Sequence, residues 1–259
     1  MSTMKIGAQL YTLRDFCKTN ADLDSTFEKV RRIGYTEVQM SGWGAEVDLK
    51  KAGEQLRKHG LKCVITHMGW QKFLNDLDGV IAAHHALDCP HTAIGGVPAE
   101  YFTEEGVRRL VKELGPITQK LAEAGLDFAY HNHSAEMARM GDKVWMQHLL
   151  DESIRAGVKV YGEIDTFWIA AGGGDPAQWL RKWTGKCPVI HLKDMSFTVA
   201  REQRMEVIGQ GNLNWPEILK ACAEAGVRSG LVEQDHTHGR DPFECLKQSY
   251  EFLAGLGYR

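Results

Sequence analysis

Residues 104–133 read EEGVRRLVKELGPITQKLAEAGLDFAYHNH and contain one complete helix-to-strand unit. Apolar residues in the first part recur at helical spacing. Gly125 follows the last helical residues, where glycine commonly ends a helix, and the short apolar run DFAY begins almost at once. That run leads into His131, Asn132 and His133. The stretch therefore predicts a helix, a tight turn and a buried strand whose carboxyl end carries imidazoles.

Units of this kind recur along the whole chain. Short β-rich runs alternate with amphipathic helical stretches, which is typical of a parallel sheet whose strands are joined by helices. Further helical stretches end at Gly34, Gly60 and Gly226, each just before a new strand. The eight expected strands begin at Lys5, Thr36, Lys62, His91, Asp127, Val158, Pro188 and Gly230.

Eight units in 259 residues favour a closed (β/α)8 barrel of the α/β class over an open sheet. No G-x-G-x-x-G follows the first strand, so a dinucleotide-binding fold lacks its main sequence signal. No linker or low-complexity tract divides the chain. We therefore expect one barrel domain over residues 1–259.

Composition and charge narrow the classes of partner. The 43% hydrophobic residues suit one large core, and a formal net charge of -3 gives no global positive field for nucleic acid. The start, MSTMKIGAQL, has no basic segment followed by a long apolar run, and no stretch is long enough to span a membrane. Six cysteines are scattered without metal-binding spacing and are expected to be reduced thiols. These features predict a cytoplasmic protein without a membrane or nucleic-acid partner, and they leave a homo-oligomer open.

Polar residues gather at the ends of strands five to eight. In a (β/α)8 barrel these ends meet at one mouth, where active sites lie. Alternate strand residues face the same side, so each strand can direct two polar side chains inward. The pairs are His131 and His133, Glu163 and Asp165, His191 and Lys193, and Glu233 and Asp235.

Two imidazoles and two carboxylates without thiolates suit a divalent cation such as Mn2+, Co2+, Zn2+ or, less well, Mg2+. The predicted ligands are His131, Asp165, His191 and Glu233. The alternative is an ordinary hydrogen-bonded barrel mouth, which the joint placement on four consecutive strands disfavours.

Other residues near the expected mouth suit contacts to a polar substrate. The predicted substrate-binding residues are His67, Trp70, Glu37, Glu163 and Trp168. Gln39 shares a strand with Glu37, and Trp43 is a further candidate apolar wall. For each tryptophan, simple packing in the core is the competing interpretation.

Several segments follow one another along the chain in this order: KIGAQLYTLR, IGYTEVQM, THMGW, YHNH, EIDTFW, VIHLKDM, and IGQGNLNWPEIL with GLVEQD. Together they resemble the sugar phosphate isomerase/epimerase superfamily of xylose-isomerase-like barrels. The resemblance implies one metal held by Glu, Asp, His and Glu from strands five to eight, with both glutamates transferring protons. Asp165, His191 and Glu233 match this pattern. His131 in YHNH stands in place of the first glutamate, as in a variant subgroup, and Trp168 stands where many relatives have histidine.

The resemblance implies isomerisation or epimerisation of a small keto-sugar or sugar derivative through a metal-stabilised enediolate, with Mn2+ as the expected metal. Glu233 is the predicted base, His133 its partner acid or base, and Lys193 the group that binds a substrate oxygen. Hydrogen bonding to substrate or to a ligand is the competing role for His133, and a salt bridge with Asp194 or a neighbouring carboxylate is the competing role for Lys193.

Three other functions compete with this one. Loss of the first glutamate favours a metal-dependent lyase or dehydratase acting by β-elimination on an inosose or 3-keto-glycoside. An endonuclease IV-like enzyme would need a basic groove that the sequence lacks. A noncatalytic sugar-binding barrel would bind its ligand without proton exchange. The sequence leaves the sugar, its phosphorylation and the native metal open.

Overall fold

Eight parallel strands form the centre of the structure, a computed structural model that describes residues 4–259. Residues 1–3 of the predicted domain lie outside the described residues. Each strand lies where the sequence predicts one, to within a few residues. In chain order the eight are β1 (Lys5–Gln9), β2 (Glu37–Met40), β3 (Lys62–His67), β4 (His91–Ile94), β5 (Asp127–His131), β8 (Tyr161–Glu163), β9 (Val189–Leu192) and β12 (Ser229–Val232).

The strands close into a barrel. Their order is β8-β5-β4-β3-β2-β1-β12-β9, and every neighbouring pair is parallel. The two ends of this order meet just beyond β8, where Asp165 pairs with His191 and the His191 amide donates to the Ile164 carbonyl at 2.9 Å. The predicted (β/α)8 fold is confirmed.

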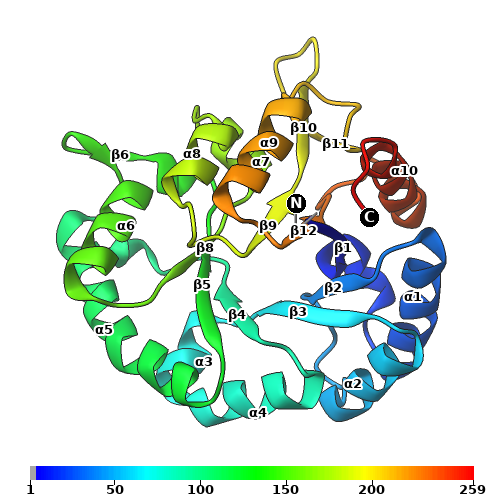
Figure 1. Ribbon diagram of the computed structural model, residues 1–259, viewed down its shortest axis with the longest axis horizontal. Coiled ribbons are helices and arrows are strands. Elements are labelled where there is room, and N and C mark those ends of the chain that lie inside the picture. Colours follow the sequence, from blue (N-terminus) through cyan, green and yellow to red (C-terminus); the bar gives the residue numbers. More distant parts are fainter. Residues whose placement is uncertain (1–3) are drawn as a thin grey trace.

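Helices surround the strands as an outer ring (Figure 1). Their apolar faces pack on the barrel because buried residues recur at helical spacing, as in α5, where Leu110, Leu114 and Leu121 are buried. The longer helices are α1 (Asn20–Ile33), α2 (Leu49–Lys58), α4 (Leu77–Leu87), α5 (Glu104–Glu123), α6 (Trp145–Ala156), α8 (Pro176–Lys182), α9 (Trp215–Ala225) and α10 (Pro242–Gly255). Shorter ones are α3 (Trp70–Asn75) and α7 (Thr166–Ala171), with 3-10 turns η1 (Leu10–Phe16), η2 (Ala99–Tyr101) and η3 (Ala135–Met137).

The glycines that the sequence places at helix ends make the turns into the strands. Gly226 ends α9 in the left-handed region with φ of 78°, and its amide bonds back to the carbonyls of Ala223 and Cys222. Gly125, with φ of 77°, makes the corresponding turn between α5 and β5. A side chain at either position would strain the backbone, so glycine fixes where each strand begins.

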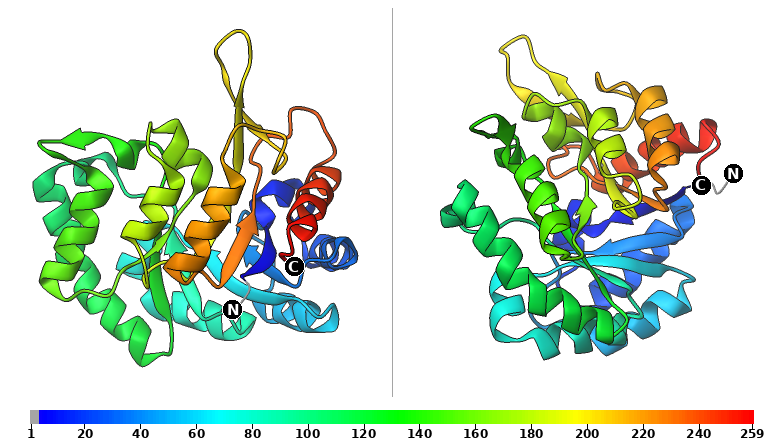
Figure 2. Two further views of the ribbon diagram at one scale, coloured as in Figure 1. Left: turned by 45° about the horizontal axis from the view of Figure 1, so that its top comes forward. Right: turned by 60° about the vertical axis from the view of Figure 1, so that its left-hand side comes forward.

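Two small antiparallel hairpins were not predicted from the sequence. The first pairs β6 (Arg139–Met140) with β7 (Lys143–Val144), and the second pairs β10 (Asp194–Phe197) with β11 (Gln203–Glu206). The β10–β11 hairpin rises from the barrel directly after β9 and stands away from the body of the molecule (Figure 2). Its base packs through Met195 and Met205 on Phe167 of α7.

The cysteines lie in the core. All six thiols are buried and none is in a disulfide within the described residues. Over residues 4–259, the structure contains no helix whose length and apolar character would allow it to cross a membrane.

Candidate metal centre and active site

The four predicted metal ligands lie at the carboxyl ends of their strands. His131 ends β5, Asp165 follows β8, His191 lies in β9 and Glu233 follows β12. Each is at most 4% exposed. Four ionisable side chains at this depth need partners or a bound cation, because an isolated buried charge is costly.

His191 stands at the centre of this group. Its Nδ1 lies 2.8 Å from Oε2 of Glu233 and 3.6 Å from Oδ2 of Asp165. Within residues 4–259, none of these three atoms has a partner with hydrogen-bond geometry. One imidazole nitrogen and two carboxylate oxygens therefore face one another, all within 4.8 Å, at the spacing of ligands around a single ion.

Local structure explains why only one oxygen of Asp165 faces the cluster. Asp165 caps α7, and its Oδ1 accepts from the amide of Trp168 at 3.0 Å. The Asp165 amide in turn donates to Oδ1 of Asn132 at 3.0 Å. The cap fixes the carboxylate, so Oδ2 is held toward His191 rather than into solvent.

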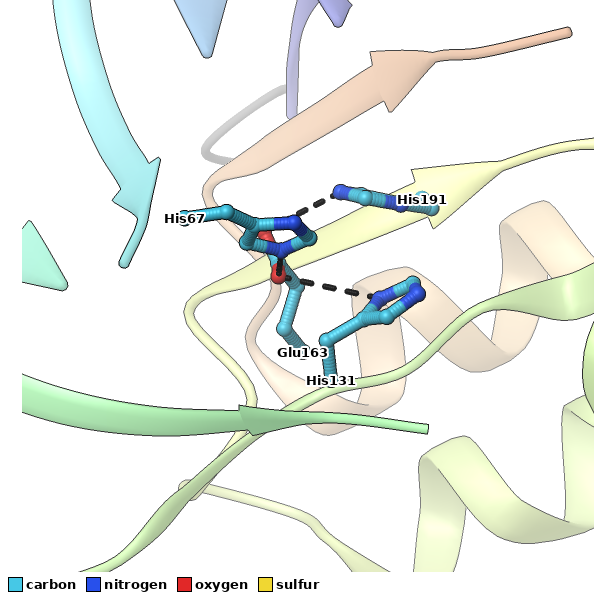
Figure 3. A group of neighbouring side chains, drawn as sticks. All are labelled: His67, His131, Glu163 and His191. Carbon is cyan, nitrogen blue, oxygen red and sulfur yellow. Dashed lines mark hydrogen bonds and ion pairs between the residues drawn. The ribbon is translucent and has the colours of Figure 1, made fainter. Parts of the chain in front are cut away.

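A second group of ligand-type side chains shares His191 (Figure 3). Glu163 lies between three imidazoles: its Oε2 is 2.6 Å from Nε2 of His67 and 3.7 Å from Nδ1 of His131, and its Oε1 is 3.1 Å from Nε2 of His191. His131 thus turns toward His67 and Glu163, while its Nδ1 has no hydrogen-bond partner among the described residues. The predicted four ligands are brought together, but as two groups that meet at His191.

Burial and neighbouring charges set the protonation of these imidazoles. Burial, together with the imidazoles of His191 and His67, holds the pKa of His131 well below its usual value. Burial opposes charging of His191, but the carboxylates of Glu163 and Glu233 outweigh it and raise its pKa well above the usual value. His131 is therefore a neutral imidazole near pH 7, the form that binds metal.

Lys193 places an ammonium among the carboxylates of the site. The side chain is 1% exposed, and its Nζ lies 2.8 Å from Glu233, 3.0 Å from Asp165 and 3.2 Å from Asp235. Burial disfavours this charge, but Asp165 and Glu233 outweigh it and raise the pKa of Lys193. Burial and the Glu233 carboxylate raise the pKa of Asp235 to about 7.

Lys193 thus forms salt bridges with neighbouring carboxylates, as the competing interpretation of the sequence allowed, but Asp194 is not among these partners. It is fully buried and accepts from the amides of Gly209 and Gly211 and from Nε1 of Trp215. Asp194 therefore orders the GQGNLN loop that leads into α9.

A cavity of about 270 Å³ opens over this cluster. His133 lines it, packs edge-on against His131 with ring centroids 4.8 Å apart, and lies 5.2 Å from the ring of Trp168. The Trp168 ring also lies 5.6 Å from Nζ of Lys193. The lining consists of Gln9, Tyr11, Ser41, His67, Gly95, His131, His133, Lys193, Glu233 and Asp235.

The structure does not bring Glu37 or Trp70 to this cavity. Glu37 begins β2 at the opposite end of the barrel, where its Oε1 lies 3.8 Å from Nζ of Lys5, so its predicted contact with substrate is wrong. Trp70 is 5% exposed and packs against Phe73 and Tyr101. It is a core residue, the alternative that the sequence left open.

Gln39 reaches the cluster in place of Glu37. It lies two residues further along β2, and its Oε1 is 2.6 Å from Nε2 of His191. Both residues face the barrel interior, but only the one nearer the carboxyl end reaches the mouth. The position within the strand was the available signal, and it favours Gln39.

The donor set fits a divalent cation. Among the described residues, the buried oxygens of Asp165 and Glu233 have ion-pair contacts to Lys193 but no hydrogen bond of good geometry, and Nδ1 of His131 has no hydrogen-bond partner. This mixture of carboxylate and imidazole suits Mn2+, Co2+ or Zn2+.

A closed (β/α)8 barrel with imidazoles and carboxylates at the carboxyl ends of its strands defines a class of barrels whose site lies at that mouth. Residues 27–254 match the family described as xylose isomerase-like TIM barrel. The chain belongs to this family.

Curated relatives match over part of the chain. It is 26% identical over 167 residues to the rhizopine catabolism protein MocC of Rhizobium meliloti, which covers 56% of this chain and 48% of that protein. It is 24% identical over 153 residues to inosose dehydratase of Clostridium botulinum, covering 52% and 50%. The chain thus spans about half the length of the curated relatives it matches.

Solved structures match over nearly the whole chain. A sugar phosphate isomerase/epimerase of Parabacteroides distasonis has a TM-score of 0.81 at 22% identity, covering 97% of this chain and 98% of that one. A structure of L-ribulose 3-epimerase has a TM-score of 0.78 at 17% identity, covering 98% and 94%. The IOLI protein with a bound zinc atom has a TM-score of 0.76 at 15% identity, covering 98% of each. At these identities the likeness shows the fold.

Proposed function

We propose that the protein is a divalent-metal-dependent isomerase or epimerase that acts on a small keto-sugar or sugar derivative by moving a proton next to the carbonyl. The observation that carries this proposal is the convergence of Nδ1 of His191, Oδ2 of Asp165 and Oε2 of Glu233, three buried ligand-type atoms that all lie within 4.8 Å of one another. The families of the similar structures support the substrate class.

His131, Asp165, His191 and Glu233 would hold the cation, with Mn2+ as the expected metal. A bound divalent cation polarises a substrate carbonyl and stabilises the negative charge that develops on its oxygen when a neighbouring proton leaves. The zinc atom bound in the IOLI structure supports a metal at the mouth of this barrel type. His131 extends the ligand set because its Nδ1 also lacks a partner among the described residues.

Glu233 is the proposed base. Its carboxylate lines the cavity, so it reaches a substrate there while Oε2 faces His191 and Lys193. His133 is the proposed second acid or base, because it lines the same cavity beside the ligands. The ammonium of Lys193 would bind a substrate oxygen and offset the charge of the surrounding carboxylates.

His67, Glu163 and Trp168 would orient the substrate. Nε2 of His67 is held by Glu163, and the edge of its ring that carries Nδ1 faces Gly95, which lines the cavity. Trp168 lies beside His133 and Lys193 and would form an apolar wall against the C–H face of a sugar. The proposed setting is cytoplasmic carbohydrate metabolism with a free small molecule as substrate.

A second function is a lyase or dehydratase that begins with the same proton removal and ends by β-elimination. Two observations favour it: relatives at 24% and 25% identity are named inosose dehydratase, and His131 occupies the position of the first family glutamate. Elimination needs one base and assistance to the leaving group, which Glu233 and His133 would supply.

The test combines metal content with solvent exchange. Purified protein is analysed for bound metals and incubated in D2O with keto-sugars, inososes and 3-keto-glycosides. We expect one divalent metal per chain and deuterium next to the carbonyl of at least one substrate. Product mass then separates the two functions, since isomers keep the substrate mass and elimination products do not. Absence of exchange from every substrate by the metal-saturated protein would refute both.

A further inference from the structure

We propose that the substrate has two units, with the reacting keto-sugar in the inner cavity and a neutral, hydroxyl-bearing second unit in an outer cavity beside it. This inference rests on the proposed function and names the substrate class of the same site. The outer cavity, about 590 Å³, is lined by Thr12, Arg14, Asp15, Phe16, Asp235, His236, Thr237, His238, Gly239 and Pro242.

The two cavities meet at Asp235, which lines both. Neighbouring residues of the chain also line the two cavities. Tyr11 lines the inner cavity and Thr12 the outer one; likewise Glu233, before Asp235, lines the inner cavity, and His236, after it, lines the outer one. Pockets for drug-sized ligands measure about 300–1,000 Å³. The inner cavity, at about 270 Å³, suits one small ring, and the outer cavity adjoins it at Asp235.

The outer cavity is fixed by hydrogen bonds from residues on both of its sides. Nη1 of Arg14 donates to the Asp235 carbonyl at 2.9 Å, and Nε2 of the buried Gln234 donates to the His236 carbonyl at 3.1 Å. Oγ1 of Thr237 donates to the Arg240 carbonyl at 2.8 Å. His238 is held at a φ of 52°, which non-glycine residues adopt rarely. Walls held in this way are preorganised for a ligand.

Charge and chemistry of the lining indicate a neutral ligand. Arg14 is the lone arginine or lysine among the described lining residues, and the carboxylates of Asp15 and Asp235 line the same cavity. Burial and the charge of Arg204 lower the pKa of His238, so its imidazole is neutral near pH 7. A phosphate would find one guanidinium here beside the carboxylate of Asp15 and the carboxyl group of Asp235, which is an unfavourable balance.

The remaining lining groups suit a sugar ring or similar polyol. Thr12, Thr237 and the histidines offer hydrogen-bond donors and acceptors, and Phe16, 43% exposed, offers an aromatic surface. An aromatic face against C–H groups with hydroxyl partners around it is how proteins bind neutral sugars. A glycoside with its keto group in the terminal ring would fill both cavities.

The experiment compares substrates that differ only in the second unit. Exchange in D2O is followed by NMR for 3-ketomaltose carrying the ketone in its non-reducing ring and for methyl 3-keto-α-glucoside, at saturating Mn2+. We expect kcat/KM to be higher for the disaccharide by about tenfold or more, because contacts to an additional part of a substrate contribute a factor of about this size. Fructose and fructose 6-phosphate form a second pair, for which the phosphate should give no advantage.

Two variants locate the effect. Phe16→Ala and His236→Ala should each lower the ratio of the disaccharide kcat/KM to the methyl glycoside kcat/KM severalfold. The control variant Phe197→Ala removes an exposed phenyl ring outside both cavities and should keep the wild-type ratio. A wild-type ratio near one, a ratio that the two cavity variants leave unchanged, or a clear preference for the phosphate would overturn the inference. In those results exchange itself persists, so the proposed function stands. Absence of exchange from all four substrates would also overturn the inference, and the full substrate panel would then decide whether the proposed function stands.

Discussion

Oε1 of Gln39 lies 2.6 Å from Nε2 of His191, joining β2 to β9 across the mouth of the barrel. An amide oxygen can only accept, so Nε2 of His191 carries the proton that it donates. This contact fixes the ring orientation and leaves Nδ1 as the nitrogen that faces Asp165 and Glu233. Gln39, with Oε1 of Glu163 3.1 Å from the same nitrogen, therefore prepares His191 as a ligand.

Replacing Gln39 by Leu removes this acceptor while keeping a similar side-chain size. Metal affinity should fall by about 10-fold or more, the usual effect of losing a partner behind a ligating histidine. A competition titration with a chromophoric chelator measures it, and circular dichroism checks that the barrel is folded. Wild-type affinity in Gln39→Leu would mean that the contact does not prepare the ligand.

Asp165→Ala and His191→Ala should each abolish stoichiometric metal binding. Residues at the barrel mouth contribute little to the core, so both variants should fold. Asp127→Asn is the matched control, because Asp127 begins β5 at the other end of the barrel and pairs with Lys159. Metal analysis after dialysis gives the stoichiometry; full occupancy in either ligand variant would exclude this site.

The fold could be predicted because its signals are local. Apolar runs such as the one before His131 form strands in the structure, and glycines such as Gly125 end helices, as their positions in the sequence predict. The β10–β11 hairpin escaped prediction because its residues are partly exposed and polar, without a clean alternation.

The sequence predicts which residues lie at the strand ends, but not how their side chains are grouped in the site. Alternation along β2 predicts that Glu37 and Gln39 face the same side, but it does not say which lies near the mouth. The grouping of His131 with His67 and Glu163 likewise depends on side-chain direction in three dimensions, between strands distant in the sequence. Nothing in the sequence pairs Lys193 with Asp235 rather than Asp194; the turn of the chain after β9 decides it.

Lys193→Met should strengthen metal binding while reducing turnover. The ammonium shares Asp165 and Glu233 with the proposed cation, and like charges about 4 Å apart repel by about 4 kcal/mol at a protein's effective dielectric constant. Affinity should therefore rise by at least about tenfold, the factor that 1.4 kcal/mol provides.

The same variant should be less stable without metal. Removing one partner of a buried ion pair costs about 3–5 kcal/mol. Calorimetry should accordingly show a lower Tm for metal-free Lys193→Met and a larger rise in Tm when Mn2+ is added. Equal metal affinity in wild type and variant would show that Lys193 and the cation do not compete for the same carboxylates.

His133→Ala should keep the metal and lose most turnover. The imidazole lines the cavity beside His131 but belongs to neither group of ligand atoms. A drop in kcat of about 10² or more is expected if it transfers a proton. Metal analysis on the same sample is the control, since loss of metal would make His133 a ligand in place of His131.

The most direct measurement of the central claim is exchange of the proton next to the carbonyl in D2O, using protein stripped by a chelator and then titrated with Mn2+. Exchange should be absent from the stripped protein and rise to a plateau near one Mn2+ per chain. Metal-saturated Glu233→Gln, which keeps an oxygen ligand without its basicity, should exchange more slowly by a factor of about 10² or more. Equal exchange with and without Mn2+, or a wild-type rate in saturated Glu233→Gln, would contradict a metal-dependent proton transfer that uses Glu233 as base.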